Sequence, residues 1–309
     1  MLSGVVGWTF LTVWTAGAAD MAVYTKEPPA PYPVFAPAVD AVNGKFDGFA
    51  GTVAGKSVAG VNGSVTVPLG GQYGAQFDGS IGSLDGSTFA AGAGHLFWRD
   101  PSQALVGLYV SETYWDRYGG ISVAHVAGEG EMYWGRFTLQ GIAGIEFGNS
   151  GAASFTSITT GPVAGAVTTF VDAYNIRTRF FDEINLKYYF ADDIAGYVGH
   201  RYLGGLNALA LGAKLARPLG HGVLASAYVE GRVGENNASG VWGGLKLYFG
   251  PTDMPLIARH RVEDPPNWNV DNLFGILGNH TTSTSTSRFC RFGLNFKNKG
   301  NCENPGTPK

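Results

Sequence analysis

Apolar and polar residues alternate with a period of two along most of the central part of the chain. Over residues 44–250, runs of about ten to fifteen residues with this period are separated by short turn sequences. In one run, Tyr73 and Phe77 share one face of an extended segment, and Gln76 and Asp78 share the other. No window shows a helical period over a useful length, so the pattern predicts strands.

The pattern predicts twelve strands, over 45–54, 58–68, 71–82, 86–98, 103–114, 119–134, 136–148, 180–190, 194–203, 206–216, 222–233 and 238–249. Strands this long suit a bilayer, because a tilted strand needs about nine to eleven residues to cross the hydrocarbon. Strands of soluble sheets average nearer five or six residues. With apolar residues outward and polar residues inward, we expect an all-β fold, a transmembrane antiparallel up-and-down β-barrel of about 12 strands.

The connections between these strands predict an orientation. An even strand count puts both ends of a barrel on the periplasmic side. The connections on that side would then be compact turns, and the sequence offers them at 69–71, 99–101, 135–136, 192–193 and 217–220. The long connection 149–179 would lie outside, either as a surface loop or folded into the pore.

Four aromatic residues are expected at the periplasmic ends of strands. A barrel carries aromatic girdles where its wall meets the two membrane interfaces. Ordinary core packing in a soluble protein is the alternative interpretation. The residues expected in the girdle are Trp98, Trp134, Phe190 and Phe249.

The two ends of the chain differ from its centre. Residues 1–19 carry an apolar core of about ten residues followed by small residues, which is typical of a cleaved signal peptide; a buried N-terminal strand is the alternative. Five prolines make 20–43 a Pro-rich leader. The expected division is therefore signal peptide 1–19, leader 20–43, β-barrel 44–250 and C-terminal periplasmic tail 251–309, exported to the bacterial outer membrane.

Composition supports this interpretation and excludes some partners. Glycine contributes 47 of 309 residues, which suits curved, closely packed strands. Charged residues make up only 15%, and the net charge of −3 gives no general attraction to nucleic acid. The longest uncharged apolar stretch is about half of what a membrane-spanning helix needs.

Several stretches of sequence resemble porin-family outer-membrane proteins of alphaproteobacteria. They are 19–26 (ADMAVYTK, followed by prolines), 133–139 (YWGRFTL), 199–202 (GHRY) and 241–250 (VWGGLKLYFG). The resemblance implies that Gly244–Phe249 is the terminal strand read by the barrel-insertion machinery. Such proteins normally end in that aromatic residue, whereas this chain continues for sixty residues past Phe249.

The inward faces carry the candidate functional residues. One group is mostly acidic, another mostly basic, and opposite charges on facing walls would produce a transverse field in an aqueous pore. The alternative is that the charges pair and fill a small closed barrel. The expected pore-lining residues are Asp78, His95, Glu129, Glu131, Glu146, Glu183, Lys187, Arg201, Lys214, Glu230, Arg232 and Lys246.

Enzymatic and metal sites leave no signature in the sequence. Ser111 and Ser226 lack a local nucleophile motif, and the histidines show no metal-ligand spacing, so we expect neither catalysis nor a metal. Related porins include haem-contacting proteins, but neither His95, His125 nor Tyr133 stands out as an axial ligand, and we expect no cofactor.

The tail carries both cysteines of the chain. Cys290 and Cys302 are expected to form a disulfide in an oxidising compartment, with free thiols as the alternative. The tail itself would cap the periplasmic mouth, contact peptidoglycan or remain unfolded.

The expected function is a porin-like diffusion channel for small polar solutes. The expected partners are outer-membrane lipid, small polar solutes and the insertion machinery, without nucleic acid, and the sequence leaves a homo-oligomer open. The alternative is a closed structural or adhesive outer-membrane barrel that binds a partner through its outer loops.

Overall fold

The computed structural model describes residues 36–160, 164–290, 295–297 and 301–303. The expected signal peptide 1–19 and most of the expected leader 20–43 lie outside these residues.

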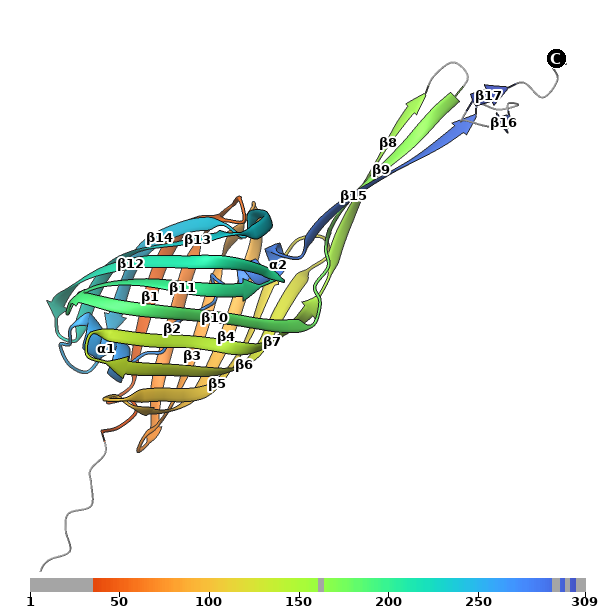
Figure 1. Ribbon diagram of the computed structural model, residues 1–309. Coiled ribbons are helices and arrows are strands. Elements are labelled where there is room, and N and C mark those ends of the chain that lie inside the picture. The colour runs from red at the N-terminus through yellow and green to blue at the C-terminus, as the bar shows by residue number, and fades with distance from the viewer. Residues whose placement is uncertain (1–35, 161–163, 291–294, 298–300, 304–309) are drawn as a thin grey trace, which may run out of the picture. The chain divides into compact units, whose positions relative to one another are not determined.

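Twelve antiparallel strands close into a barrel, which confirms the expected fold class and strand count (Figure 1). The strands follow one another around the wall in chain order, except that β7 pairs directly with β10, and β14 closes the ring against β1. They are β1 (Asn43–Val53), β2 (Lys56–Gly70), β3 (Tyr73–Leu84), β4 (Ser87–Asp100), β5 (Ala104–Trp115), β6 (Ile121–Trp134), β7 (Phe137–Asn149), β10 (Arg179–Ala191), β11 (Ile194–Leu203), β12 (Leu206–Gly220), β13 (Val223–Gly234) and β14 (Gly240–Phe249).

The wall is apolar outside and polar inside. On β3, Phe77 is 63% exposed, whereas its neighbour Gln76 is fully buried. Every strand repeats this alternation, because successive side chains of a strand point to opposite faces. The outer surface is therefore a continuous apolar belt, to which Leu96, Leu108, Val126, Ile145, Leu186, Leu211, Val229 and Leu245 belong.

Two groups of turns define the two mouths of the barrel. The proximal mouth carries the turns 71–72, 101–103, 135–136, 192–193 and 221–222 and the end of β14, and all these turns are as short as expected. The distal mouth carries 54–55, 85–86, 116–120, 204–205 and 235–239, where a 3-10 helix spans Glu235–Asn237. Because the turns are short at both mouths, turn length does not show which mouth faces the periplasm. Only the connection after β7 differs clearly in length from the others.

The turn between β12 and β13 gives a stability prediction. Gly220 and Gly222 both have positive φ, 87° and 76°. A Cβ at Gly222 would collide with the carbonyl oxygen of Gly250, whereas a Cβ at Gly220 would have nothing within 4 Å. We expect Gly222→Val to lower the urea midpoint clearly more than Gly220→Val, since both strain the backbone but only the first also collides. Equal midpoints in the two variants would contradict this packing.

The connection after β7 is itself a β-structure, neither a plain surface loop nor a segment folded into the pore. It forms β8 (Gly151–Thr160) and β9 (Ala164–Tyr174), and β15 (His280–Cys290) adds to the other side of β9. The order is β15-β9-β8, and we call this sheet the extension. Beyond it, β16 (Asn295–Lys297) pairs with β17 (Asn301–Glu303).

The expected tail 251–309 does not simply leave the barrel at the proximal mouth, because its residues 256–279 lie inside the ring of strands; its periplasmic location stays a prediction. Two short helices, α1 (Leu256–Val262) and α2 (Leu273–Leu277), lie within the ring of strands, and almost every residue over 263–279 is buried (Figure 1). Polar groups of this stretch form hydrogen bonds with polar groups of the inner wall. If the lumen were empty, those wall groups would bind water instead.

The described end of the leader packs at the proximal mouth. Ala38 and Val39 form a small buried cluster with Phe97 and Leu105. The backbone N–H of Ala38 donates to Gly71 O at 3.0 Å, and Arg99 donates to Ala38 O at 3.3 Å.

Candidate functional site

The most distinctive site is the interior of the barrel, where the chain's own residues 256–279 lie. We call residues 250–279, which include the exposed residues 251–253 at the proximal mouth, the lumen segment. At the proximal mouth, Ile257 N–H donates to Asp192 O at 3.0 Å; at the distal mouth, Asn175 N–H donates to Asn279 O at 3.0 Å. The lumen segment therefore crosses the barrel from one mouth to the other.

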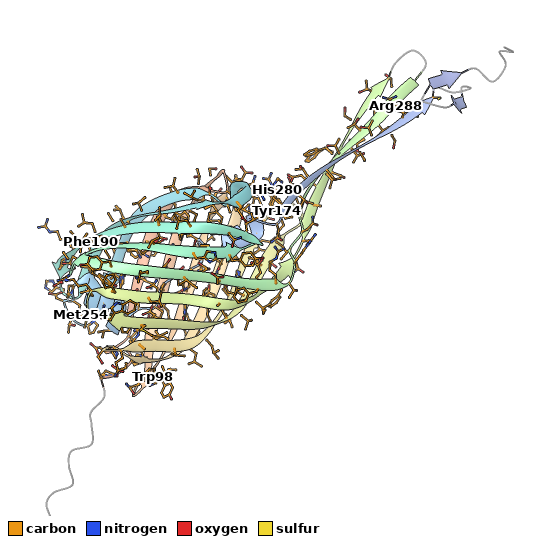
Figure 2. All side chains as sticks on the ribbon, viewed as in Figure 1. Trp98, Tyr174, Phe190, Met254, His280 and Arg288 are labelled. Atoms are coloured by element: carbon orange, nitrogen blue, oxygen red, sulfur yellow. The ribbon has the colours of Figure 1, made fainter. Side chains whose placement is uncertain are left out.

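Figure 2 identifies the two mouths by labelled side chains. Trp98, Phe190 and Met254 lie at the end where the lumen segment enters, and Tyr174 and His280 lie at the end where it leaves. β14 thus ends at the proximal mouth and β15 begins at the distal mouth.

Helix α1 anchors the entrance of the lumen segment. Arg259 donates to Gly222 O at 3.1 Å and pairs with Glu263 one turn later. The ring of His260 lies between two wall tyrosines, with Nδ1 2.8 Å from Tyr189 Oη and Nε2 3.3 Å from Tyr248 Oη. These contacts bind α1 to β10, β14 and the β12–β13 turn.

The extended stretch between the helices is held by charged and polar wall residues. Lys45 Nζ lies 2.6 Å from Asp264 Oδ2, and both side chains are buried. Further along, Asn269 donates to Ser80 Oγ at 2.8 Å, and Gln76 donates to Pro265 O at 3.2 Å. The lumen segment is thus tied to β1 and β3 on one side of the barrel.

Asp271 is the electrostatic centre of the lumen. Its Oδ1 accepts a hydrogen bond from Arg232 Nε at 2.6 Å and lies 3.3 Å from Arg201 Nε. The same arginines also pair with wall acids, Arg201 with Glu183 at 3.2 Å and Arg232 with Glu230 at 3.3 Å. Asp271 therefore completes a network that spans β10, β11 and β13, and all its arginine contacts are removed from bulk water.

Helix α2 closes the distal half with apolar contacts. Leu273, Phe274, Ile276 and Leu277 are buried and belong to one hydrophobic cluster with residues of the wall, including Trp242. The rings of Phe274 and Trp242 lie 6.1 Å apart. Each such side chain favours the buried state by about 1.5–3 kcal/mol relative to exposure in water.

The structure places the twelve expected pore-lining residues on the inner face. Ten are buried, while Lys214 and Glu230 keep partial exposure to the remaining space. Some of these charges pair with neighbours, since Glu183 pairs with Arg201 and Lys246 Nζ lies 3.1 Å from Asp47 Oδ1. The expected transverse field stays a prediction.

Several residues of this network were not among the expected ones. Lys45, Asp47 and Arg99 are inward positions of alternating strands, so the period-two pattern could have identified them. Asp264 and Asp271 lie in the tail, where no pattern pointed to the lumen.

Little space remains in the lumen. A cavity of about 50 Å3 lies between the lumen segment and the wall, lined by Lys187, Lys214, Lys246 and Trp268 among others. That volume holds a few water molecules. Within the described residues, the cavity does not amount to a path for a solute.

One chain of side chains has the residue types of a hydrolase triad. Ser111 Oγ lies 3.1 Å from His125 Nδ1, and His125 Nε2 lies 3.7 Å from Glu146 Oε2. However, Asn272 of the lumen segment donates to Ser111 Oγ at 3.1 Å, and all three wall residues are buried. In this arrangement the three side chains lie against the lumen segment and are not open to solvent.

The residues considered for haem or metal are also engaged. His95 contacts Glu129 through Nδ1 at 2.6 Å and Asp78 through Nε2 at 3.2 Å, and Tyr133 donates to Glu131 at 2.6 Å. In the described part of the chain, no group of three or more His, Cys, Asp or Glu is arranged to hold a metal ion.

The expected aromatic girdle residues all lie at proximal strand ends. Trp134, Phe190 and Phe249 are exposed on the outer surface, and Trp98 is half-buried and donates to Gln72 at 3.3 Å. Among the described residues, no helix is long and apolar enough to cross a membrane.

Of the two cysteines, Cys290 at the end of β15 takes part in a disulfide. The structure describes only the backbone of Cys302, in β17. The pairing of Cys290 with Cys302 stays a prediction.

Comparison with known proteins gives likeness of fold only. No protein-family model and no curated protein matches the chain. Among solved structures, a loop-deletion mutant of OmpT, an outer membrane protein of Vibrio cholerae, matches with 10% identity and a TM-score of 0.24, covering 67% of this chain and 97% of its own. Salmonella typhi OmpF in complex with daunomycin matches with 8% identity and a TM-score of 0.25, covering 67% and 96%.

Proposed function

We propose that this chain is an outer-membrane β-barrel closed by its own lumen segment, and that it presents the extension at the cell surface to bind a partner. The observation that carries the proposal is the course of residues 256–279, which lie in the lumen and lead to β15 at the distal mouth. A barrel with this interior serves as a support for the sheet it displays.

The outer surface supports a membrane location. The apolar belt covers the whole wall, and such a surface far exceeds what a soluble protein leaves in water. The closed hydrogen-bonded ring satisfies the backbone in lipid. Export through a signal peptide at 1–19 and delivery by the insertion machinery belong to this proposal.

Passage of small polar solutes is a second candidate, supported by the polar inner wall. It requires the lumen segment to leave the barrel, because the ion pairs of Asp264 and Asp271 and the packing of α2 now occupy the path. Conduction would therefore be gated rather than continuous.

Surface labelling tests which mouth faces the outside. We expect Ser285→Cys, on the exposed β15, to react with a membrane-impermeant maleimide on intact cells. The matched control is Gln103→Cys in an exposed turn of the proximal mouth, which should react only after the outer membrane is opened. The reverse result would place the extension in the periplasm and overturn the proposal.

A further inference from the structure

The extension has two unpaired edges. Among the described residues, β8 and β15 each pair only with β9, over ten and eleven residue pairs without a register shift. Nearly all side chains of both strands are exposed. Each edge therefore offers a row of free backbone N–H and C=O groups that can pair with another strand.

The two edges carry few of the features that usually prevent such pairing, since Arg288, near the far end of β15, is the one Lys, Arg, Asp or Glu residue in the described residues of β8 and β15. Proteins protect open edges with lysine, proline or bulges. β8 contains no charged residue, and residues 281–287 of β15 are all serine or threonine. Phe155, Ile158 and Phe170 are exposed, and packing against a second sheet would remove part of their apolar surface from water.

The direction of β15 is set by its connections. Gly151 pairs with Tyr174, and Tyr174 with His280, at the end of the extension next to the distal mouth. Arg288 and Phe289 pair with Ala166 and Gly165 at the opposite end. β15 therefore runs away from the barrel, and Figure 2 shows Arg288 at the end remote from His280.

We propose that β15 pairs antiparallel with β15 of a second copy of this chain, centred on Thr284. In this register Thr284 faces its own counterpart, Thr282 faces Thr286 of the other copy, and the two extensions form one continuous sheet of six strands. Antiparallel pairing is favoured because it is slightly more stable per residue than parallel pairing.

Charge complementarity selects this register. Arg288 would lie opposite His280 of the other copy and on the same face as Asp172, whose Oδ1 is 2.6 Å from His280 Nε2. Within its own chain Arg288 makes no ion pair with another described residue. Two equivalent contacts between Arg288 and Asp172 would thus form, one at each end of the joined strands.

Asp172 is prepared to accept this contact. Partial burial would raise its pKa, but hydrogen bonds from Tyr118 and His280 outweigh that effect and lower the pKa of Asp172. A lowered pKa keeps the carboxylate charged at neutral pH, where it attracts Arg288 of the other copy.

The geometry determines how the two barrels would be arranged. Because β15 runs away from its own barrel and the strands pair antiparallel, the two barrels lie at opposite ends of the joined sheet. This arrangement joins two opposed membranes rather than two barrels in one membrane. The membrane part of the inference rests on the proposed function, whereas the strand pairing does not.

Cross-linking of the full-length protein in detergent tests the register. Thr284→Cys should give a disulfide-linked dimer after mild oxidation, because opposed Cα atoms lie about 4.5–5.5 Å apart across an antiparallel pair. Thr282→Cys is the matched control and should give no dimer alone, since it would face Thr286; combined with Thr286→Cys it should. A dimer from Thr282→Cys alone, or none from Thr284→Cys, would overturn the register.

Charge substitution tests which edge is used. Thr284→Lys places two like charges opposite each other and should shift the protein from dimer to monomer in sedimentation. Thr156→Lys introduces the same charge on the other edge strand, β8, and should leave the dimer intact. Loss of dimer only with Thr156→Lys, or a monomeric unsubstituted protein, would refute pairing through β15.

Vesicles test the arrangement across two membranes. Liposomes that carry the full chain should cluster, and Thr284→Lys should abolish clustering. A protein that dimerises through β15 yet never clusters vesicles would overturn the opposed arrangement while leaving the strand pairing in place. Maleimide labelling from the periplasmic side would instead refute the proposed function alone.

Discussion

Removal of residues 251–309 is expected to turn a silent barrel into a conducting one. The full chain should show no steps in planar bilayers, because the lumen segment crosses the interior and the cavity between its middle part and the wall measures only about 50 Å3. Truncation after Gly250 removes the segment but leaves all twelve wall strands and the β14–β1 closure. We therefore expect discrete ohmic steps from the truncated protein.

A second truncation isolates the cause. A chain that ends at Asn279 keeps the lumen segment and loses only β15 and the residues after it, so it should stay silent. Gel mobility of unboiled samples shows whether each barrel is folded. A truncated protein that folds and still does not conduct would show that the wall closes without the segment.

Asp271→Asn is expected to loosen the lumen segment in the intact chain. The substitution removes the charge that Arg201 and Arg232 share, and all three side chains are buried. Breaking a buried pair by removing one partner typically costs about 3–5 kcal/mol. We expect brief openings in bilayers where the unsubstituted protein shows none, and a lower urea midpoint.

The control applies the same substitution to an exposed pair. Asp192 lies 2.9 Å from Arg136 at the proximal mouth, and its side chain is 60% exposed. Exposed pairs contribute about 0–1 kcal/mol, so Asp192→Asn should leave both conductance and midpoint nearly unchanged. Equal effects of the two substitutions would mean that Asp271 does not hold the segment.

The wall of the barrel was predictable because each strand separates two environments. Lipid on one side and a polar interior on the other impose the alternation seen at Gln76 and Phe77, and strand length then indicates a membrane. The same alternation placed Glu183, Arg201 and Arg232 inward. It could not tell that these charges pair locally, since register between neighbouring strands decides which side chains meet.

The extension was not predictable from alternation. Both faces of β8 and β15 are exposed, so no difference between faces is imposed on the sequence, and serine and threonine occupy both. The third strand of the extension, β15, comes from a segment more than one hundred residues further along the chain, as the pairing of Thr281 with Ala173 shows. A pattern within a short window of sequence cannot reveal such a pairing.

The sequence by itself determined the twelve strands, their inward and outward faces and the aromatic residues at the proximal strand ends. The reason is that a strand between lipid and a polar interior must alternate apolar and polar residues with a period of two. Only the tertiary structure decided that residues 256–279 lie in the lumen and lead to β15 at the other mouth. The wall surrounds this segment on all sides with both polar and apolar residues, so the segment's own sequence shows no regular alternation between two faces. Its contacts depend on which wall residues the strands bring next to it. They are Asp271 with Arg232, Asn272 with Ser111, and Phe274 with Trp242.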